Sequence, residues 1–231
     1  MTTDVAPPLR AILFDLDGTL LDTAPDMVGA LNALLRERHL EPLPYAAVRA
    51  SVSHGSARLI RLGFPDADPH AFADLQRRYL EIYSAALSRE TRLFNGMDGV
   101  LEELVKRGLK CGIVTNKPAW LTDPLLEQLA LTARFVCVVS GDTVGERKPH
   151  AMPMLHAAAL AGVAAVECLY VGDAERDMRA ARAAGMPGLV AAYGYLHPDE
   201  DWQAWGADGV IHSPGDLLPW LEASGRLWQT A

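Results

Sequence analysis

Two carboxylates stand at the end of a strongly apolar run near the start of the chain, in the stretch ILFDLDGTLLDTAPD (Ile12–Asp26). The run Ala11–Phe14 is typical of a short strand that is buried on both faces. Asp15 and Asp17 follow it directly, so their charges are expected to repel each other and to lose hydration. A divalent cation is the simplest partner that compensates both effects, and the pattern therefore predicts a metal site at this strand end.

Five further apolar runs are spaced along the chain, and segments with apolar residues at helical spacing lie between them. Apolar runs of roughly four to six residues, rich in Val and Ile and without alternation, are typical of parallel strands covered on both faces. Alternating strands and helices predict an α/β fold with three layers around an open parallel sheet. The later strands are expected within Lys110–Asn116, Phe135–Gly141, Glu167–Asp173, Gly188–Gly194 and Asp208–Ser213.

The stretch from about Ala24 to Arg92 differs from the rest, because it contains helical patterns and no strand pattern. Its amphipathic segments are DMVGALNALLRERHL, ASVSHGSARLIRLGF and HAFADLQRRYLEIYSAAL. A helical block directly after the first strand predicts a second, smaller domain inserted into the α/β core. We expect residues 1–22 and 93–231 to form the core and residues 23–92 to form the all-helical domain.

The charge balance restricts the class of partner, since 21 Lys and Arg against 29 Asp and Glu give a formal charge of −8. Nucleic-acid binding needs a basic surface and is not expected, whereas a metal ion and a few cations can still hold a small anion. No apolar run approaches the roughly 18 residues of a membrane span, and no signal pattern is present, so a cytoplasmic protein without membrane contact is expected. The odd number of cysteines predicts buried thiols at Cys111, Cys137 and Cys168.

Polar residues follow four of the predicted strands at the point where each strand ends. In an open parallel sheet the carboxyl ends of the strands share one edge, and ligands bind at that edge. The polar residues are therefore expected to converge there, although they span most of the chain. They are Asp15 and Asp17, Thr115 and Asn116, Lys148, and Asp173 and Asp177.

The motifs DLDGT, TNK, ERKPHAMP and GDAERD occur in this order and together resemble the four motifs of the haloacid dehalogenase superfamily. The likeness covers essentially the whole chain and is to the large branch of Mg²⁺-dependent phosphatases with a helical cap after the first strand. The resemblance implies a Rossmann-like core and phosphoryl transfer through an aspartyl-phosphate. It also implies that Asp15, Asp173 and the backbone carbonyl of Asp17 bind Mg²⁺.

The same resemblance assigns the catalytic roles. Asp15 would be the nucleophile, and Asp17 would protonate the leaving group and then deprotonate the attacking water. Lys148 would neutralise charge on Asp15 and on the phosphoryl group. Thr115 and the backbone of Asn116 would hold phosphoryl oxygens. Two further residues would support these groups: Thr19 would brace the loop, and Asp177 would orient Lys148 and a water ligand of the metal.

Each motif by itself has an ordinary structural explanation. The aspartates of DLDGT and GDAERD and the pair Thr115–Asn116 could cap the helices that follow them, and Lys148 could be a solvated loop lysine. The functional interpretation therefore depends on the four motifs as a set.

The helical insert carries the candidate specificity residues in SVSHGSARLIR, where Gly55 interrupts the helical pattern. His54, Ser56 and Arg58 beside it could reach the site when the insert closes, and an ordinary helix turn with a solvated Arg58 is the alternative. Lys117 is a further candidate at the rim.

The resemblance extends to phosphoglycolate phosphatases, and the segments SVSHGSARLIRLGF and AYGYL are similar to a branch that dephosphorylates N-acetylmuramic acid 6-phosphate in peptidoglycan recycling. The predicted substrate is thus a small phosphate ester with a carboxylate, N-acetylmuramic acid 6-phosphate, with 2-phosphoglycolate as the alternative. A roomy cleft would favour the amino sugar, and a tight one would favour glycolate.

Three other functions fit parts of the pattern. A sugar phosphomutase of the same fold would return the phosphoryl group to the sugar, and a non-enzymatic phospho-receiver module also uses Asp, Thr and Lys on a parallel sheet. Asp17 and the helical insert argue against the receiver module, and Asp17 also argues against a dehalogenase, which needs no acid for its leaving group. A monomer or a weak homodimer is expected.

Overall fold

A computed structural model describes residues 7–226 and contains a six-stranded parallel sheet with the strand order β5-β4-β1-β6-β7-β8. The central strand β1 pairs with β4 on one side and with β6 on the other. The three-layer α/β prediction is confirmed, and each strand lies inside the run that predicts it. The bounds are Ala11–Phe14 (β1), Lys110–Val114 (β4), Cys137–Val139 (β5), Cys168–Gly172 (β6), Gly188–Ala191 (β7) and Gly209–Ile211 (β8).

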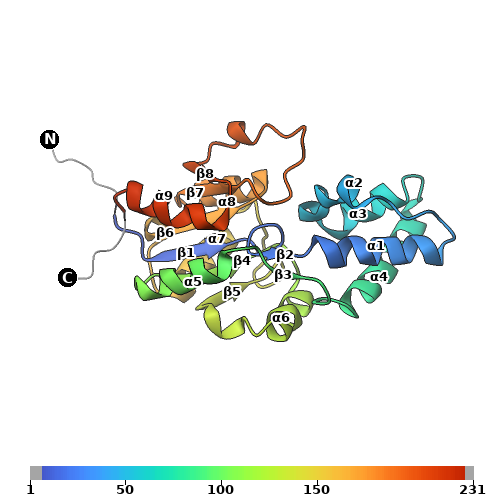
Figure 1. The fold of residues 1–231 in the computed structure, drawn as a ribbon, viewed down its shortest axis with the longest axis horizontal. Coiled ribbons are helices and arrows are strands. Elements are labelled where there is room, and N and C mark those ends of the chain that lie inside the picture. The colour runs from blue at the N-terminus through green and yellow to red at the C-terminus, as the bar shows by residue number, and fades with distance from the viewer. Residues whose placement is uncertain (1–6, 227–231) are drawn as a thin grey trace.

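Helices cover both faces of the sheet, which explains why its strands are apolar without alternation (Figure 1). In β1, Ile12 and Phe14 pack into one apolar cluster with α5 and α9, whereas Ala11 and Leu13 pack into a second cluster with α7 and α8. The helices of the core are Met97–Lys106 (α5), Ala119–Gln128 (α6), Met152–Ala161 (α7), Glu175–Ala183 (α8) and Leu217–Ala223 (α9).

The four α-helices between Asp22 and Arg92 form a bundle beyond the carboxyl edge of the sheet (Figure 1). The long helices α1 and α4 pack against each other, and Asp68 caps α4 by accepting hydrogen bonds from the backbone N–H groups of His70 and Ala71. The all-helical insert of the predicted fold class is thus confirmed. Its helices are Ala24–Glu37 (α1), Tyr45–Arg49 (α2), Gly55–Gly63 (α3) and Pro69–Ser84 (α4).

Two short segments join the insert to the core, and they pair with each other. Leu21–Asp22 (β2) and Arg92–Leu93 (β3) form a two-stranded antiparallel ribbon at the places where the chain enters and leaves the insert. Asp26 at the start of α1 accepts hydrogen bonds from the backbone of Glu90 and from the backbone and hydroxyl of Thr91. Both ends of the insert are therefore fixed to one another.

The segment predicted as one helix around Gly55 differs in the structure. It divides into a 3₁₀ turn, Val52–His54, and helix α3, because Gly55 has a φ of +76° that interrupts the regular backbone. The three cysteines are free and buried, as predicted. Burial raises the pKa of each thiol, to about 12 for Cys111. In the described part of the chain, no helix combines the length and apolar character that a bilayer crossing demands.

Candidate active site

The strand order brings three of the four motifs to adjacent positions at the carboxyl edge of the sheet. Asp15 follows β1, while Thr115 and Asp173 follow its two neighbours β4 and β6. The fourth motif comes from the loop after β5, which places Lys148 beside Asp15. The convergence predicted from topology is present.

Three buried carboxylates form a compact acidic cluster at this edge. Asp15, Asp173 and Asp177 each offer an oxygen, and these oxygens lie within 4.8 Å of one another. Asp173 Oδ2 accepts hydrogen bonds from the Ser53 hydroxyl at 2.6 Å and the Tyr195 backbone N–H at 2.9 Å. Asp173 Oδ1 is buried and has no protein partner among the described residues. Hard carboxylate oxygens, one of them unpartnered, fit a Mg²⁺ ion.

The local charges are consistent with a cation site. Burial raises the pKa of Asp173 to about 7, and the neighbouring charges of Asp15 and Asp177 act in the same direction. Burial also raises the pKa of Asp177, although the Lys148 ammonium opposes it. A divalent cation would stabilise the ionised form of this cluster.

Two glycines allow the backbone to approach Asp173 closely. Gly18 has a φ of +85°, and a Cβ there would lie 2.0 Å from Asp173 Oδ2. A Cβ on Gly194 would lie 2.3 Å from the Gly18 carbonyl oxygen. The DLDGT turn and the AYGYL loop therefore meet at the acidic cluster, where no larger residue fits without displacement.

Lys148 is fully buried and uses its ammonium group within the protein. Its Nζ lies 3.0 Å from Asp15 Oδ1 and 2.8 Å from Asp177 Oδ1, and it donates a 2.7 Å hydrogen bond to the Tyr170 hydroxyl. Tyr170 in turn donates to the Val114 carbonyl oxygen at 2.7 Å. Because an ammonium group has three donors, this arrangement satisfies and orients Lys148 completely.

Asp15 is held as an anion between two cations. Burial raises its pKa, but Lys148 and Arg176 outweigh burial, and the pKa of Asp15 lies below its ordinary value. Arg176 Nη2 lies 3.6 Å from Asp15 Oδ2, and the Leu16 backbone N–H donates to Oδ1 at 2.7 Å. An ionised carboxylate at the wall of a cavity is suited to act as a nucleophile.

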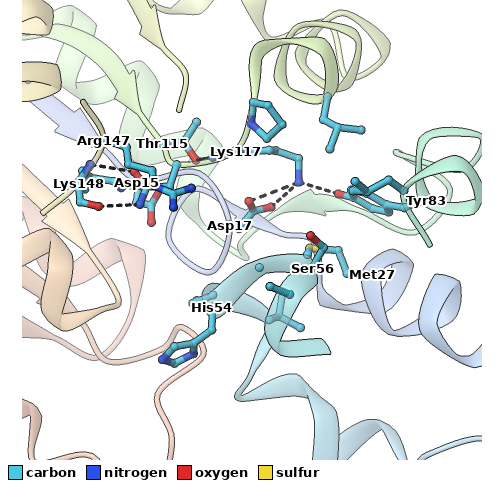
Figure 2. A pocket seen from close by; sticks show the side chains of 18 of the residues that line it. Asp15, Asp17, Met27, His54, Ser56, Tyr83, Thr115, Lys117, Arg147 and Lys148 are labelled. Atoms are coloured by element: carbon cyan, nitrogen blue, oxygen red, sulfur yellow. Dashed lines mark hydrogen bonds and ion pairs between the residues drawn. The ribbon is translucent and has the colours of Figure 1, made fainter. Parts of the chain in front are cut away.

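Asp17 lies on the other side of the turn, beside the insert (Figure 2). Its carboxylate accepts hydrogen bonds from the Thr23 hydroxyl at 2.7 Å and from Lys117 Nζ at 3.0 Å. Lys117 reaches between Asp17 and Tyr83, and it donates to the Tyr83 hydroxyl at 2.8 Å (Figure 2). Lys117, a candidate specificity residue, is thus buried and bridges Asp17 to the insert.

The other predicted core residues also lie close to the cluster. Thr115 is buried at the cavity wall, and its Oγ1 accepts from the Lys117 backbone N–H. The Asn116 side chain exchanges two hydrogen bonds with the backbone of Lys148 and so fixes the loop after β5. Thr19 is buried, and its carbonyl oxygen accepts from the Tyr193 hydroxyl at 3.0 Å.

A cavity of about 650 Å³ lies between this edge and the insert. Asp15, Asp17 and Lys148 form part of its core wall, while His54 and Ser56 project from the insert on the opposite side (Figure 2). Gly55 also lines the cavity, whereas Arg58 is exposed and is not part of the lining.

His54 lies at the mouth of this cavity. Its Nε2 lies 3.6 Å from Glu200 Oε1, and burial together with the Arg176 charge lowers its pKa. The structure therefore places His54, Gly55 and Ser56 at the cavity and leaves Arg58 in solvent.

Comparison with known proteins identifies the group to which this site belongs. The family described as haloacid dehalogenase-like hydrolase matches residues 12–191. The chain belongs to the haloacid dehalogenase-like hydrolases. The match spans all four motifs and the helical insert.

Individual relatives of this hydrolase agree with the family. It is 46% identical to a phosphoglycolate phosphatase of Xanthomonas campestris pv. campestris over 90% of this chain and 94% of that one. It is 37% identical to an N-acetylmuramic acid 6-phosphate phosphatase of Pseudomonas putida over 94% and 97% of the two chains. A crystal structure described as a predicted phosphoglycolate phosphatase from Haemophilus somnus 129PT superposes with a TM-score of 0.81 at 26% identity, covering 91% of this chain and 97% of that one. The hydrolase is thus a phosphatase, an enzyme for phosphoric monoesters, as the sequence predicts.

Four residues of the site were not among the sequence-based candidates of this hydrolase. Arg176 lies inside GDAERD and could have been noticed as a cation within a motif. Tyr170 is part of a buried strand pattern, and Tyr83 and Ser53 are part of helical patterns in the insert, so no local signal distinguishes them. Their roles depend on contacts between segments that are far apart in sequence.

Proposed function

We propose that this hydrolase cleaves a small phosphate monoester that carries a carboxylate, with 2-phosphoglycolate as the favoured substrate. The observation that carries the proposal is the pairing of a buried, ionised Asp15 with Lys148 at 3.0 Å, next to the acidic cluster and the cavity. The 46% identity to a phosphoglycolate phosphatase over 90% of the chain supports 2-phosphoglycolate over N-acetylmuramic acid 6-phosphate, the substrate predicted from the sequence.

In the first proposed step, a carboxylate oxygen of Asp15 attacks phosphorus, and the bond between phosphorus and the ester oxygen breaks. Asp17 gives a proton to the departing alkoxide, which leaves as an alcohol. Asp17 is suited to this task because its carboxylate lies at the cavity, on the side of the turn away from Lys148 (Figure 2). The product of this step is an aspartyl-phosphate on Asp15.

In the second step, Asp17 takes a proton from a water molecule, whose oxygen attacks phosphorus. The bond from phosphorus to Asp15 breaks, which releases inorganic phosphate and restores the carboxylate. The same group acts first as acid and then as base. Thr115 and the backbone of Asn116 are proposed to hold phosphoryl oxygens, and Lys148 to neutralise charge at Asp15 during both steps.

The proposed cofactor is Mg²⁺, held by the side chains of Asp15 and Asp173 and by the backbone carbonyl of Asp17. When bound, this ion neutralises the charge of the phosphoryl group and of the carboxylates. Asp177, whose Oδ1 lies 2.8 Å from Lys148 Nζ, is proposed to fix the position of that lysine. Thr19, whose carbonyl oxygen accepts from the Tyr193 hydroxyl, is proposed to brace the turn that carries Asp17.

Residues 23–92 are proposed to act as a cap domain over a core of residues 1–22 and 93–231. Three contacts between the insert and the core support this. Ser53 donates to Asp173, Lys117 donates to Tyr83, and Arg49 Nη1 donates to the Gly194 carbonyl oxygen at 2.9 Å. His54, Gly55 and Ser56 are proposed to contact the leaving group, because they line the opposite wall.

N-acetylmuramic acid 6-phosphate is the second candidate, and the size of the cavity favours it. A volume of about 650 Å³ lies within the range of pockets that hold drug-sized ligands, and it exceeds what a two-carbon ester needs. The 37% identity to an N-acetylmuramic acid 6-phosphate phosphatase agrees with this candidate.

The test is a comparison of kcat/KM for 2-phosphoglycolate, N-acetylmuramic acid 6-phosphate and glucose 6-phosphate, each with Mg²⁺ and with EDTA. We expect phosphoglycolate to be preferred and all turnover to stop with EDTA. A preference for the amino sugar would replace the favoured substrate with the second candidate. Phosphate release that is unaffected by EDTA would contradict the proposed use of Mg²⁺. A requirement for a sugar bisphosphate activator would instead indicate a phosphomutase.

A further inference from the structure

Arg176 lies in the active site but has no role in the two proposed steps. It belongs to the first turn of α8, between the acidic residues Asp173 and Asp177, and its side chain lines the cavity. The side chain is 21% exposed, so most of it lies within the protein. Asp15, Asp177 and Asp173 raise its pKa against the effect of burial, so the guanidinium is a permanent positive charge.

The guanidinium makes almost no use of its hydrogen-bonding capacity. Among residues 7–226 it donates no hydrogen bond, and its buried Nε has no partner. Its one ion pair in this part of the chain joins Nη2 to Asp15 Oδ2 at 3.6 Å, which is longer than a hydrogen bond. A guanidinium has five N–H donors in a rigid fork, and leaving them unpaired in a buried position is costly.

Lys148, the other cation beside Asp15, differs from Arg176 in how its donors are used. The two cations lie at the two oxygens of the same carboxylate, with Lys148 at Asp15 Oδ1 and Arg176 at Asp15 Oδ2. Lys148 is fully buried and satisfied by Asp15, Asp177 and Tyr170. Arg176 has donors free at the cavity wall, so of these two cations it is the one that remains available to a ligand.

An anion in the cavity would satisfy these donors. A phosphoryl group transferred to Asp15 places its oxygens next to the carboxylate that Arg176 already faces. The planar fork of arginine matches phosphate oxygens and forms short, charge-assisted hydrogen bonds with them. The nearby carboxylates explain why the positive charge of Arg176 is tolerated here, but they do not accept hydrogen bonds from its N–H groups.

We propose that Arg176 binds a non-bridging oxygen of the phosphoryl group while that group moves between the ester and Asp15. It is thus a catalytic residue that stabilises the charge of the transition state, in addition to Lys148. This inference rests on the proposed phosphatase mechanism, but it does not depend on which ester is the substrate.

The test compares Arg176→Met and Arg176→Lys with Arg179→Met as the matched control. Arg179 lies one turn further along the same helix and is exposed. Two quantities are measured with saturating Mg²⁺: the affinity for inorganic phosphate by calorimetry, and kcat/KM for the preferred ester. For Arg176→Met we expect about tenfold weaker phosphate binding and about 100-fold lower kcat/KM, with a smaller loss for Arg176→Lys, which keeps the charge but not the fork.

Arg179→Met is expected to match the unmodified enzyme, and thermal unfolding shows whether each variant is folded. If Arg176→Met binds phosphate normally but binds Mg²⁺ with altered affinity, Arg176 balances the acidic cluster and the inference is overturned. Unchanged phosphate binding and unchanged turnover would overturn it as well. A failure to turn over any candidate substrate would contradict the proposed function. The role of Arg176 would still be tested in that case, because the affinity for inorganic phosphate is measured without any ester.

Discussion

The core edge and the inner surface of the insert face each other across one cavity, but they are held in different ways. At the core edge, Lys148 is fixed by Asp15 directly after β1, by Tyr170 in β6 and by Asp177 in α8, so all three partners belong to the core. On the insert, the side chains that line the cavity include the apolar Met27, Val52 and Leu80, and the insert contacts the catalytic groups through few hydrogen bonds.

This difference indicates how the two parts share the work. Charges that depend only on the core keep their geometry whatever the insert does. Contacts such as those from Ser53 to Asp173 and from Lys117 to Tyr83 exist only while the insert lies against the core. We therefore expect core substitutions to abolish chemistry and insert substitutions to change substrate preference and apparent affinity.

Asp15→Asn is the strongest test of the core side. The amide keeps the size of the side chain but cannot serve as an anionic nucleophile, so we expect kcat to fall by about 10⁴-fold or more. Circular dichroism is expected to show an unchanged fold. Ordinary turnover in this variant would remove Asp15 as the nucleophile.

Lys148→Met is expected to damage both activity and stability. The loss of the ammonium leaves Asp15 and Asp177 without their buried cation, which corresponds to a decrease of roughly 3–5 kcal/mol in the free energy of unfolding without metal. We also expect a loss of about 10²–10³-fold in kcat. Urea unfolding and steady-state kinetics measure the two effects, and the exposed Lys106→Met serves as the control. Equal stability of the two variants would show that the buried charges are compensated in another way.

The acidic cluster makes the effect of Mg²⁺ on stability depend on pH. Burial raises the pKa of Asp173 in the metal-free fold from the ordinary 3.8 to about 7. Between about pH 4 and pH 7, the folded protein therefore keeps a proton on Asp173 that the unfolded chain has lost. The metal-free protein is therefore expected to lose stability as the pH rises through this window, and Asp177 acts in the same direction. Asp15 has a lowered pKa, so its contribution to the free energy of unfolding is lost only when the pH falls below the ordinary titration range of an aspartate.

Since Mg²⁺ requires the ionised carboxylates, it must displace this proton at pH 6 but not at pH 8. We expect Mg²⁺ to raise the Tm by a few degrees more at pH 8 than at pH 6 in thermal unfolding. Asp173→Asn is expected to remove the Mg²⁺ effect at both values. An equal shift at pH 6 and pH 8 in the unmodified protein would contradict the raised pKa.

Tyr83→Phe is expected to have the smallest effect and tests the insert side. It removes the hydroxyl that accepts from Lys117 but keeps the ring, so Lys117 and Asp17 lose a link to the insert. We expect a change of less than about tenfold in kcat/KM, with most of it in KM. Tyr79→Phe is the matched control, because the Tyr79 hydroxyl donates to Met27 within the insert. A loss comparable to that of Lys148→Met would show that the insert takes part in the chemistry itself.

The sequence was sufficient to predict the parts of the molecule that depend on local pattern and sheet topology. The six strands follow from apolar runs, and the meeting of Asp15 with Asp173 follows from the rule that parallel strands end at one edge. Short elements were less accessible. Helix α2 has only 5 residues and no clear apolar period, and the break at Gly55 changes one expected helix into a turn and a shorter helix.

Contacts between the insert and the core could not be predicted, because they depend on how two separately patterned regions dock. Nothing near Ser53 or Tyr83 in the sequence indicates that one reaches Asp173 and the other Lys117. Arg176 was missed for another reason. Its position in a motif is visible, but the unsatisfied state of its guanidinium is a property of the folded cavity alone.

Phosphorylation of Asp15 is the event on which the whole mechanism depends. It can be measured directly by quenching the enzyme in acid within its first turnover and mapping the modified peptide by mass spectrometry. We predict a phosphoryl adduct on Asp15 that appears before inorganic phosphate and is absent from Asp15→Asn. An adduct on another residue, or a burst of phosphate without any adduct, would contradict it.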